Sequence, residues 1–158
     1  MKKEQGWINL YKPKNISSFN AVQQIKKKFN LKKIGHAGTL DPLAQGILPI
    51  AFGKTTKLIS FINNNKKTYK FTILWGQQTE SDDSQGKIIA KSDLIPKLDQ
   101  IKIKIKNFFG YIDQIPPKLS AVKINGKRAY KLFRKNINFE LKNKKVFVKN
   151  IKILIHNN

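Results

Sequence analysis

Apolar residues recur at helical spacing in three stretches of the chain. The first helix is expected to begin at Ser17 or Ser18, because a serine hydroxyl can accept from the free N–H groups of a first helical turn. Its apolar face has residues three and four positions apart: Phe19, Val22, Ile25 and Phe29. A second, short helix, capped by Thr55 or Thr56, is expected to carry Leu58, Ile59 and Ile62. The spacing at 94–108 fits a third helix, although the alternation at 101–105 also fits a strand.

Alternating apolar and polar residues predict strands in the second half of the chain. The segment 69–75 places four residues on one face: Tyr69, Phe71, Ile73 and Trp75. Further strands are expected at 87–90, 111–115, 120–124 and 146–155, with polar loops at 63–67, 77–85 and 142–145. The pair Asn125-Gly126 predicts a tight turn, and a short helix is expected near 128–135. The pattern predicts an α+β fold with a mixed, mainly antiparallel sheet flanked by helices and loops.

The length and the absence of cysteine exclude several classes of protein. The chain has 158 residues, which suits one domain over 1–158, since domains usually have about 100–200 residues. It has no cysteine, so a disulfide scaffold, a thiolate zinc site and a cysteine nucleophile are excluded. Two histidines, His36 and His156, are too few for a histidine-built metal site. No apolar run approaches the roughly 20 residues of a membrane span, and the N-terminus lacks a signal-peptide pattern. We therefore expect a soluble, cytoplasmic protein.

The charge of the chain indicates a polyanionic partner. There are 32 basic and 9 acidic residues, which gives a formal net charge of +23. A surplus of this size is typical of nucleic-acid binding. All the basic residues except Arg128 and Arg134 are lysine, which compositional drift would also produce, but drift does not explain why acids are scarce. Since lysine is a point charge without the fork of arginine, binding is expected to depend strongly on salt.

Candidate chemistry is concentrated in the glycine-rich stretch 35–46. Its glycines permit backbone geometry that other residues avoid, and Pro42 fixes φ and keeps Asp41 out of the helical region. We expect an ordered loop between two helical patterns that presents His36 and Asp41, five residues apart. Loops on a rigid scaffold often carry catalytic groups. A structural turn, in which Asp41 caps the following backbone, is the alternative.

Other chemistries find little support in the sequence. A phosphate-binding loop fails, because Leu48 stands where the first glycine before Gly53-Lys54-Thr55 would be required. The acids at 80–83 could hold Mg²⁺, but acids in a Ser/Gln/Gly-rich loop are more often turn-formers. No nucleophile elbow is present. We expect no metal.

Four stretches resemble one enzyme family. The segment 35–49 resembles the catalytic motif of the TruB-type tRNA pseudouridine-55 synthases. The segment 6–18, with Lys12-Pro13 and Ser17-Ser18, is similar to their N-terminal motif, and 67–86 to their tyrosine strand and the loop that follows it. The segment 115–130 resembles their RNA-gripping thumb, which would span about 116–140 here. The resemblance covers nearly the whole chain and implies a pseudouridine synthase fold.

The resemblance implies a reaction and a catalytic group. A uridine in the T-arm of tRNA, uridine 55, is converted to pseudouridine without a cofactor, by breaking the N1–C1′ bond and joining C5 to C1′. Asp41 is the implied catalytic carboxylate. It could attack C1′, take a proton from the sugar, or stabilise positive charge that develops at C1′. The target base must leave the stack to be reached.

The resemblance also implies binding residues. Tyr69 would stack on the flipped uracil, and His36 would fill the space that the base vacates. Lys12 is expected at the substrate-binding site, where it supports the active-site loop. The expected RNA contacts of the thumb are Lys123, Lys127 and Arg128.

The chain also departs from the family pattern. Tyr11 replaces a usual Asp, and Asn15 replaces a usual Gly, which is a mild change because asparagine tolerates left-handed geometry. Family members continue past the strand that ends near 155, with a Gly-Thr-Tyr-Ile-Arg-like motif whose arginine pairs with the catalytic aspartate. That motif and the C-terminal RNA-binding appendage of many members are absent here, so the fold is expected to be incomplete at its C-terminus.

Two function classes follow for this sequence. The first is a tRNA pseudouridine synthase that acts as a monomer on the T-arm stem-loop, without a guide RNA and without a membrane. The second is a non-catalytic tRNA-binding protein, either an RNA chaperone or a decayed remnant of such an enzyme.

Overall fold

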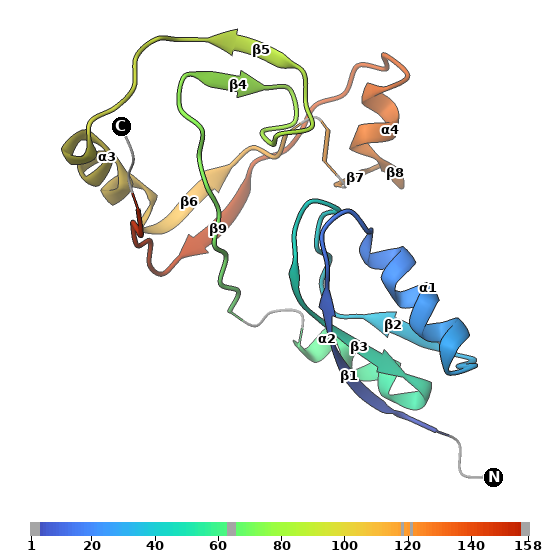
Figure 1. Ribbon diagram of the computed structural model, residues 1–158. Helices are drawn as coiled ribbons and strands as arrows, with labels where there is room; N and C mark the ends of the chain where they lie inside the picture. Colours follow the sequence, from blue (N-terminus) through green and yellow to red (C-terminus); the bar gives the residue numbers. More distant parts are fainter. Residues whose placement is uncertain (1–3, 63–65, 118, 121, 156–158) are drawn as a thin grey trace. The chain divides into compact units, whose positions relative to one another are not determined.

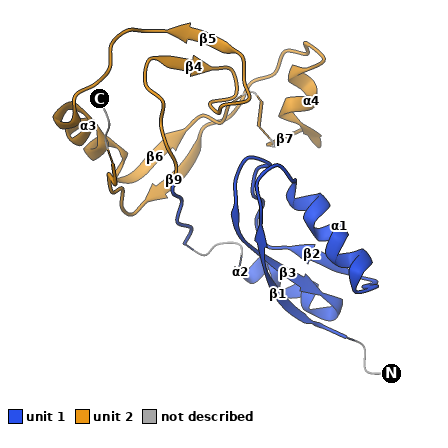
Figure 2. Ribbon diagram, in the orientation of Figure 1, with its two compact units in different colours: residues 1–70 blue, residues 71–158 orange. Residues whose placement is uncertain are grey.

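The computed structural model describes residues 4–62, 66–117, 119–120 and 122–155 (Figure 1). The chain divides into two compact units, which we name unit 1, Met1–Lys70, and unit 2, Phe71–Asn158 (Figure 2). All strand pairs of the described residues are antiparallel, which confirms the α+β fold with mainly antiparallel sheets. The expectation of one catalytic domain over 1–158 stays a prediction. Among the described residues, no helix has the length and apolar character needed to cross a membrane.

Unit 1 is built on a three-stranded sheet. The strands β1 (Gly6–Lys12), β2 (Ile34–His36) and β3 (Gly46–Phe52) lie in the order β1-β3-β2. The register pairs Lys12 with Gly46 and His36 with Ile50. The loop 37–45 therefore leaves the sheet at His36 and re-enters it beside Lys12. The sequence pattern placed this loop between helices, and that was wrong, because it joins two strands.

The helix α1 (Ser18–Lys28) packs on one face of this sheet. The buried core joins two residues of α1 to two of β3: Ala21, Val22, Leu48 and Ile50. The predicted start is confirmed, and the cap is Ser17, whose side chain accepts from the N–H of Asn20 at 3.1 Å. The predicted apolar face is only partly correct. Phe19 is 65% exposed, because the face that meets the sheet includes Ser18 and Ala21 instead.

The second predicted helix begins differently from its prediction. A 3₁₀ segment, η1 (Gly53–Leu58), leads directly into α2 (Ile59–Ile62), so no threonine caps a helix here. The hydroxyl of Thr56 instead donates to the carbonyl oxygen of Gly53 at 2.9 Å. Gly53 has a φ of +65°, and a Cβ there would lie 2.3 Å from the carbonyl oxygen of Glu4. The entry into η1 therefore requires glycine.

The described residues of unit 2 form three two-stranded sheets and two helices. The pairs are β4 (Gln77–Thr79) with β5 (Ile88–Lys91), β6 (Gly110–Gln114) with β9 (Lys144–Val148), and β7 (Lys123–Ile124) with β8 (Lys127–Arg128). The helices are α3 (Leu98–Ile105), which continues as the 3₁₀ turn η2 (Lys106–Phe108), and α4 (Ala129–Phe133). The helical alternative for 94–108 and the short helix near 128–135 are thus confirmed. The turn is confirmed as well, since Asn125 and Gly126 both have positive φ, as in the primed hairpin turns.

Several strand predictions in the second half need correction. Residues 69–74 form no strand, because none of the described segments pairs with them. The strand expected at 146–155 runs over Lys144–Val148 instead, so part of the predicted loop 142–145 is paired. The predicted strand at 120–124 is reduced to β7, and β4 lies inside the polar stretch predicted as a loop. Residues 63–65 of the first predicted loop and His156 lie outside the described residues.

Candidate active site

The glycine-rich loop between β2 and β3 is ordered by its own backbone. The N–H of Ala37 donates to the carbonyl oxygen of Pro49 at 2.8 Å, and the N–H of Ala44 donates to that of Asp41 at 3.0 Å. Gly38 has a φ of +86°, in the left-handed region that favours glycine. The predicted ordered loop is confirmed. It presents the side chain of Asp41 to solvent.

Lys12 lies at the end of β1, beside this loop, and its side chain is fully buried. Its Nζ donates to the carbonyl oxygens of Pro13 at 2.9 Å and Ile16 at 2.8 Å, and lies 3.5 Å from that of Pro42. Burial lowers the pKa of Lys12 below its ordinary value of 10.5, and the nearby carboxylate of Asp41 opposes that shift. The buried ammonium therefore joins β1, the segment after it and the Asp41 loop.

The lowered pKa of Lys12 predicts a dependence of stability on pH. Between the pKa of folded Lys12 and the ordinary 10.5, the unfolded chain binds more protons than the folded chain. The free energy of unfolding should therefore rise with pH across that window, relative to a Lys12→Met protein that lacks the titrating group. Urea unfolding of both proteins at a series of alkaline pH values measures the difference. Curves that stay parallel over the whole window would contradict the assignment.

His36 ends β2 and is half-buried beside the same loop. Its Nδ1 is hydrogen bonded to the carbonyl oxygen of Gly38. A carbonyl oxygen can only accept, so Nδ1 of His36 is the donor in this bond. The structure thus brings His36, Lys12 and Asp41 together around one loop.

Two residues of the segment after β1 bond to the backbone on either side of Asp41. The N–H of Asn15 donates to the carbonyl oxygen of Pro42 at 2.7 Å, and Asn15 has a φ of +66°, as its tolerance of left-handed geometry predicts. The hydroxyl of Ser18 bonds to both main-chain polar groups of Leu40. The sequence did not single out Ser18 for this contact, because its signals, a helix cap and a place in the motif-like segment 6–18, applied equally to Ser17.

Asp41 is an acidic residue in a unit whose charged residues are nearly all lysine. Over residues 1–70 the sequence has 14 lysines and only two acids, Glu4 and Asp41. An isolated carboxylate in a strongly basic surrounding is a candidate for chemistry on a polyanion.

The remaining predicted site residues lie elsewhere. Tyr69 belongs to no helix or strand and is 68% exposed, and no contact among the described residues joins it to Asp41. Lys123, Lys127 and Arg128 lie together in the β7–β8 hairpin of unit 2, with their side chains exposed. The structure thus groups the three predicted RNA contacts with one another.

The acidic stretch 80–83 forms a turn. The carboxylate of Asp83 accepts from the Ser81 hydroxyl at 2.7 Å and from the N–H of Gln85 at 2.9 Å, and the hydroxyl of Thr79 donates to the carbonyl oxygen of Asp83. Within the described ranges, no three His, Cys, Asp or Glu residues gather to hold a metal ion.

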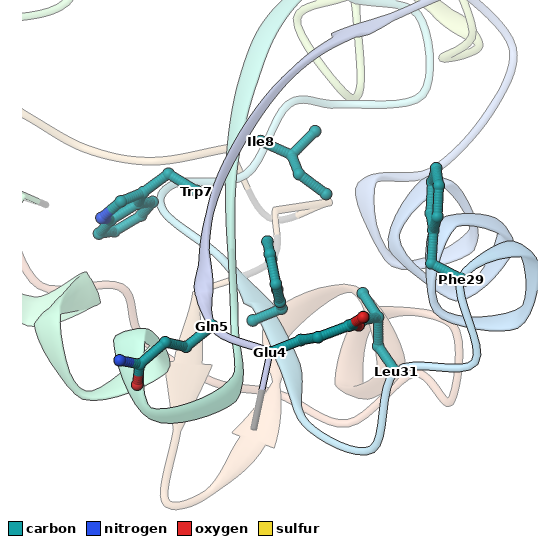
Figure 3. Close-up of a pocket in the computed structure, with 7 residues that line it drawn as sticks. Glu4, Gln5, Trp7, Ile8, Phe29 and Leu31 are labelled. Atoms are coloured by element: carbon teal, nitrogen blue, oxygen red, sulfur yellow. The ribbon is translucent and has the colours of Figure 1, made fainter. Parts of the chain in front are cut away.

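A pocket of about 460 Å³ lies at the other end of β1 (Figure 3). It is lined by Glu4, Gln5, Trp7, Ile8, Phe29, Leu31 and Phe52. A strand rises about 3.3 Å per residue, so Trp7 lies roughly 17 Å along β1 from Lys12. The pocket is therefore separate from the Asp41 loop.

A family profile decides the relationship of the chain to known proteins. The profile of the TruB family pseudouridylate synthase (N terminal domain) matches residues 26–158, a range that includes the Asp41 loop and the β7–β8 hairpin. The chain belongs to the TruB family. The pseudouridine synthase fold that the sequence implied is thus confirmed.

Curated TruB-family proteins match the chain over most of its length. A protein of Ehrlichia chaffeensis, named tRNA pseudouridine synthase B, is 51% identical over 149 residues, which are 94% of this chain and 50% of that protein. A Wolbachia pipientis protein of the same name is 52% identical over 149 residues, 94% of this chain and 42% of that protein. The chain thus spans about half the length of these relatives. A shorter Rickettsia prowazekii protein is 47% identical over 148 residues, which cover 86% of it and 94% of this chain.

A solved structure supports the TruB-family fold. A crystal structure of a Cbf5-Nop10-Gar1 complex contains a chain that is 32% identical to this one, with a TM-score of 0.50. The likeness covers 75% of this chain and 31% of that one. The family membership thus has support from both sequence and structure.

Proposed function

We propose that this chain is the catalytic part of a tRNA pseudouridine synthase, which isomerises uridine 55 of the T-arm to pseudouridine with Asp41 as its catalytic carboxylate. The observation that carries the proposal is the accessible carboxylate of Asp41 on an ordered loop, in a unit that has only one other acid. The names of the relatives, tRNA pseudouridine synthase B, support the substrate class.

The reaction suits one carboxylate and needs no external reactant. The N1–C1′ bond breaks, the uracil turns, C5 bonds to C1′, and the proton that leaves C5 is balanced by one gained at N1. Asp41 serves by attacking C1′, by accepting a proton from the sugar, or by stabilising positive charge at C1′. Main-chain groups of its neighbours Leu40 and Pro42 are held by hydrogen bonds, so the main chain around Asp41 does not have to be ordered when substrate binds.

Binding residues follow from the same proposal. The target uridine leaves the T-arm stack, Tyr69 stacks on its ring, and His36 fills the space that the base leaves. The large exposure of Tyr69 leaves its ring accessible for stacking on a base. Lys123, Lys127 and Arg128 contact phosphates of the T-arm from the β7–β8 hairpin. The protein acts as a monomer in the cytoplasm, without a cofactor or a guide RNA.

The test is pseudouridine formation at a single position. The 158-residue chain, and the same chain extended to the length of its relatives, are incubated with an unmodified tRNA transcript. Mass spectrometry of nuclease fragments then locates any pseudouridine. We expect it at position 55 and nowhere else, and a transcript with cytidine at that position should remain unmodified. Modification at other positions alone would contradict the proposed specificity.

The same experiment tests the second function class. A non-catalytic tRNA-binding protein would bind the transcript and leave it unmodified, in both the 158-residue and the extended form. Tight binding without pseudouridine in the extended form would therefore replace the enzyme with an RNA-binding protein.

A further inference from the structure

Ser18 makes an unusual pair of hydrogen bonds with the residue before Asp41. Its hydroxyl oxygen accepts from the N–H of Leu40 at 2.9 Å, and the same hydroxyl donates to the carbonyl oxygen of Leu40 at 2.9 Å. The side chain is 2% exposed. One buried hydroxyl thus satisfies both main-chain polar groups of a residue 22 positions away, much as a paired strand would.

The helix does not need this hydroxyl. Ser17 is the N-cap of α1, with its own side chain accepting from the N–H of Asn20. Ser18 is the first residue of the helix, where its hydroxyl is free to bond outside the helix. Two adjacent serines therefore have different partners, one inside α1 and one in the Asp41 loop.

The bonds to Leu40 complete a frame around Asp41. The side chain of Leu40 packs against the core cluster of α1 and β3, so both its side chain and its main chain are held. On the other side of Asp41, the carbonyl of Pro42 accepts from the N–H of Asn15, and the proline ring fixes its own φ. Asp41 is thus an exposed residue between two held neighbours.

We propose that Ser18 is a positioning residue for Asp41, because its hydroxyl fixes the main chain of Leu40 and thereby the direction in which the carboxylate points. The inference rests on the proposed function, in which Asp41 reacts with the nucleotide. Ser18 touches no substrate in this role. A misplacement of about 1 Å at a reacting group can cost about a hundredfold in rate.

The test compares three variants in the pseudouridine assay described above. Ser18→Ala should lower kcat by about ten- to a hundredfold with little change in KM for tRNA, since it alters geometry and not RNA contacts. Ser18→Thr keeps a hydroxyl and should restore much of the lost kcat. Ser17→Ala is the matched control, since it removes the neighbouring hydroxyl and the helix cap but leaves the bonds to Leu40 in place. It should lower the melting temperature and keep kcat.

A second measurement does not need turnover. The side-chain carboxyl carbon of Asp41 has an NMR signal whose position and width report the order of the group. We expect that signal to shift or broaden in Ser18→Ala, and not in Ser17→Ala. An unchanged signal, or a folded Ser18→Ala protein with full kcat, would overturn the inference.

The activities of Asp41→Asn and Ser18→Ala distinguish a failure of the proposed function from a failure of the role of Ser18. If Asp41→Asn keeps full turnover, Asp41 is not the catalytic group and the proposed function fails. If Asp41→Asn is inactive while Ser18→Ala is folded and fully active, only the role of Ser18 fails.

Discussion

The Asp41→Asn protein is expected to bind the tRNA T-arm with nearly unchanged affinity and to form pseudouridine at least about a thousandfold more slowly. Asparagine has almost the shape of aspartate, so the loop and its bonds to Ser18, Asn15 and Ala44 should be kept. The amide can neither attack C1′ nor accept a proton from the sugar. The loss should therefore fall on kcat. Single-turnover kinetics with saturating enzyme, beside a tRNA-binding titration, separates the two quantities.

The chain supplies a matched control for this substitution. Glu4 is the only other acid in unit 1, and it lines the pocket at the opposite end of β1. Glu4→Gln makes the same change in net charge without touching the Asp41 loop, so it should keep full turnover. If the two substitutions lower the rate equally, the loss does not depend on the position of the carboxylate, and the catalytic role of Asp41 is contradicted.

The Asp41→Asn protein should also differ in the titration of Lys12. The carboxylate of Asp41 opposes the effect of burial on the pKa of Lys12, so its removal should lower that pKa further. The shift provides a check that the carboxylate of Asp41 lies beside Lys12 in the unsubstituted protein and that Lys12 stays buried in the variant.

Local patterns predicted the helices better than the central sheet. The spacing in α1 and α3 is a property of neighbouring residues, and both helices formed where the pattern indicated. The sequence of β3 is an almost continuous apolar run interrupted by Pro49. Leu48, Ile50 and Ala51 are buried in the structure. Because such a run has no alternation of apolar and polar residues, it gave no signal for a half-buried strand. The segment 69–75 shows the opposite failure. It alternates well, but a strand also needs a partner, which an alternation pattern cannot provide.

The sequence predicted the part of the candidate site that lies within one short segment, but not the contacts between distant segments. The glycines and Pro42 indicated an ordered loop, and this loop does hold His36 and Asp41. The contact of Ser18 with Leu40 joins residues 22 positions apart, and no pattern within either segment predicts it. Two adjacent serines at a helix start look alike in a sequence, and only the fold shows that one caps the helix and the other holds the loop.

The affinity for tRNA is expected to fall about a thousandfold when the salt concentration rises from about 50 to about 200 mM. This magnitude corresponds to about six phosphates neutralised by the protein, each of which releases condensed counterions on binding. The positive charge of the chain is large enough for these contacts, since its formal net charge is +23. Nearly all of its basic residues are lysine. Lysine binds phosphate as a point charge, so its contacts should carry little sequence information and much salt dependence. Titrations at four or more salt concentrations give the slope.

Single lysines should contribute to this slope in a predictable way. Lys127→Gln, in the exposed β7–β8 hairpin, should weaken binding and reduce the salt slope by about one if its ammonium contacts a phosphate. Lys102→Gln is the matched control, because the Nζ of Lys102 already lies 3.2 Å from a carboxylate oxygen of Asp99. Both substitutions remove one positive charge from the exposed surface of unit 2, so a general effect of net charge would appear in both. A slope that falls equally in the two proteins would show that the hairpin is not a particular contact. A fall confined to Lys127→Gln would indicate that the β7–β8 hairpin is a site at which the T-arm backbone is bound.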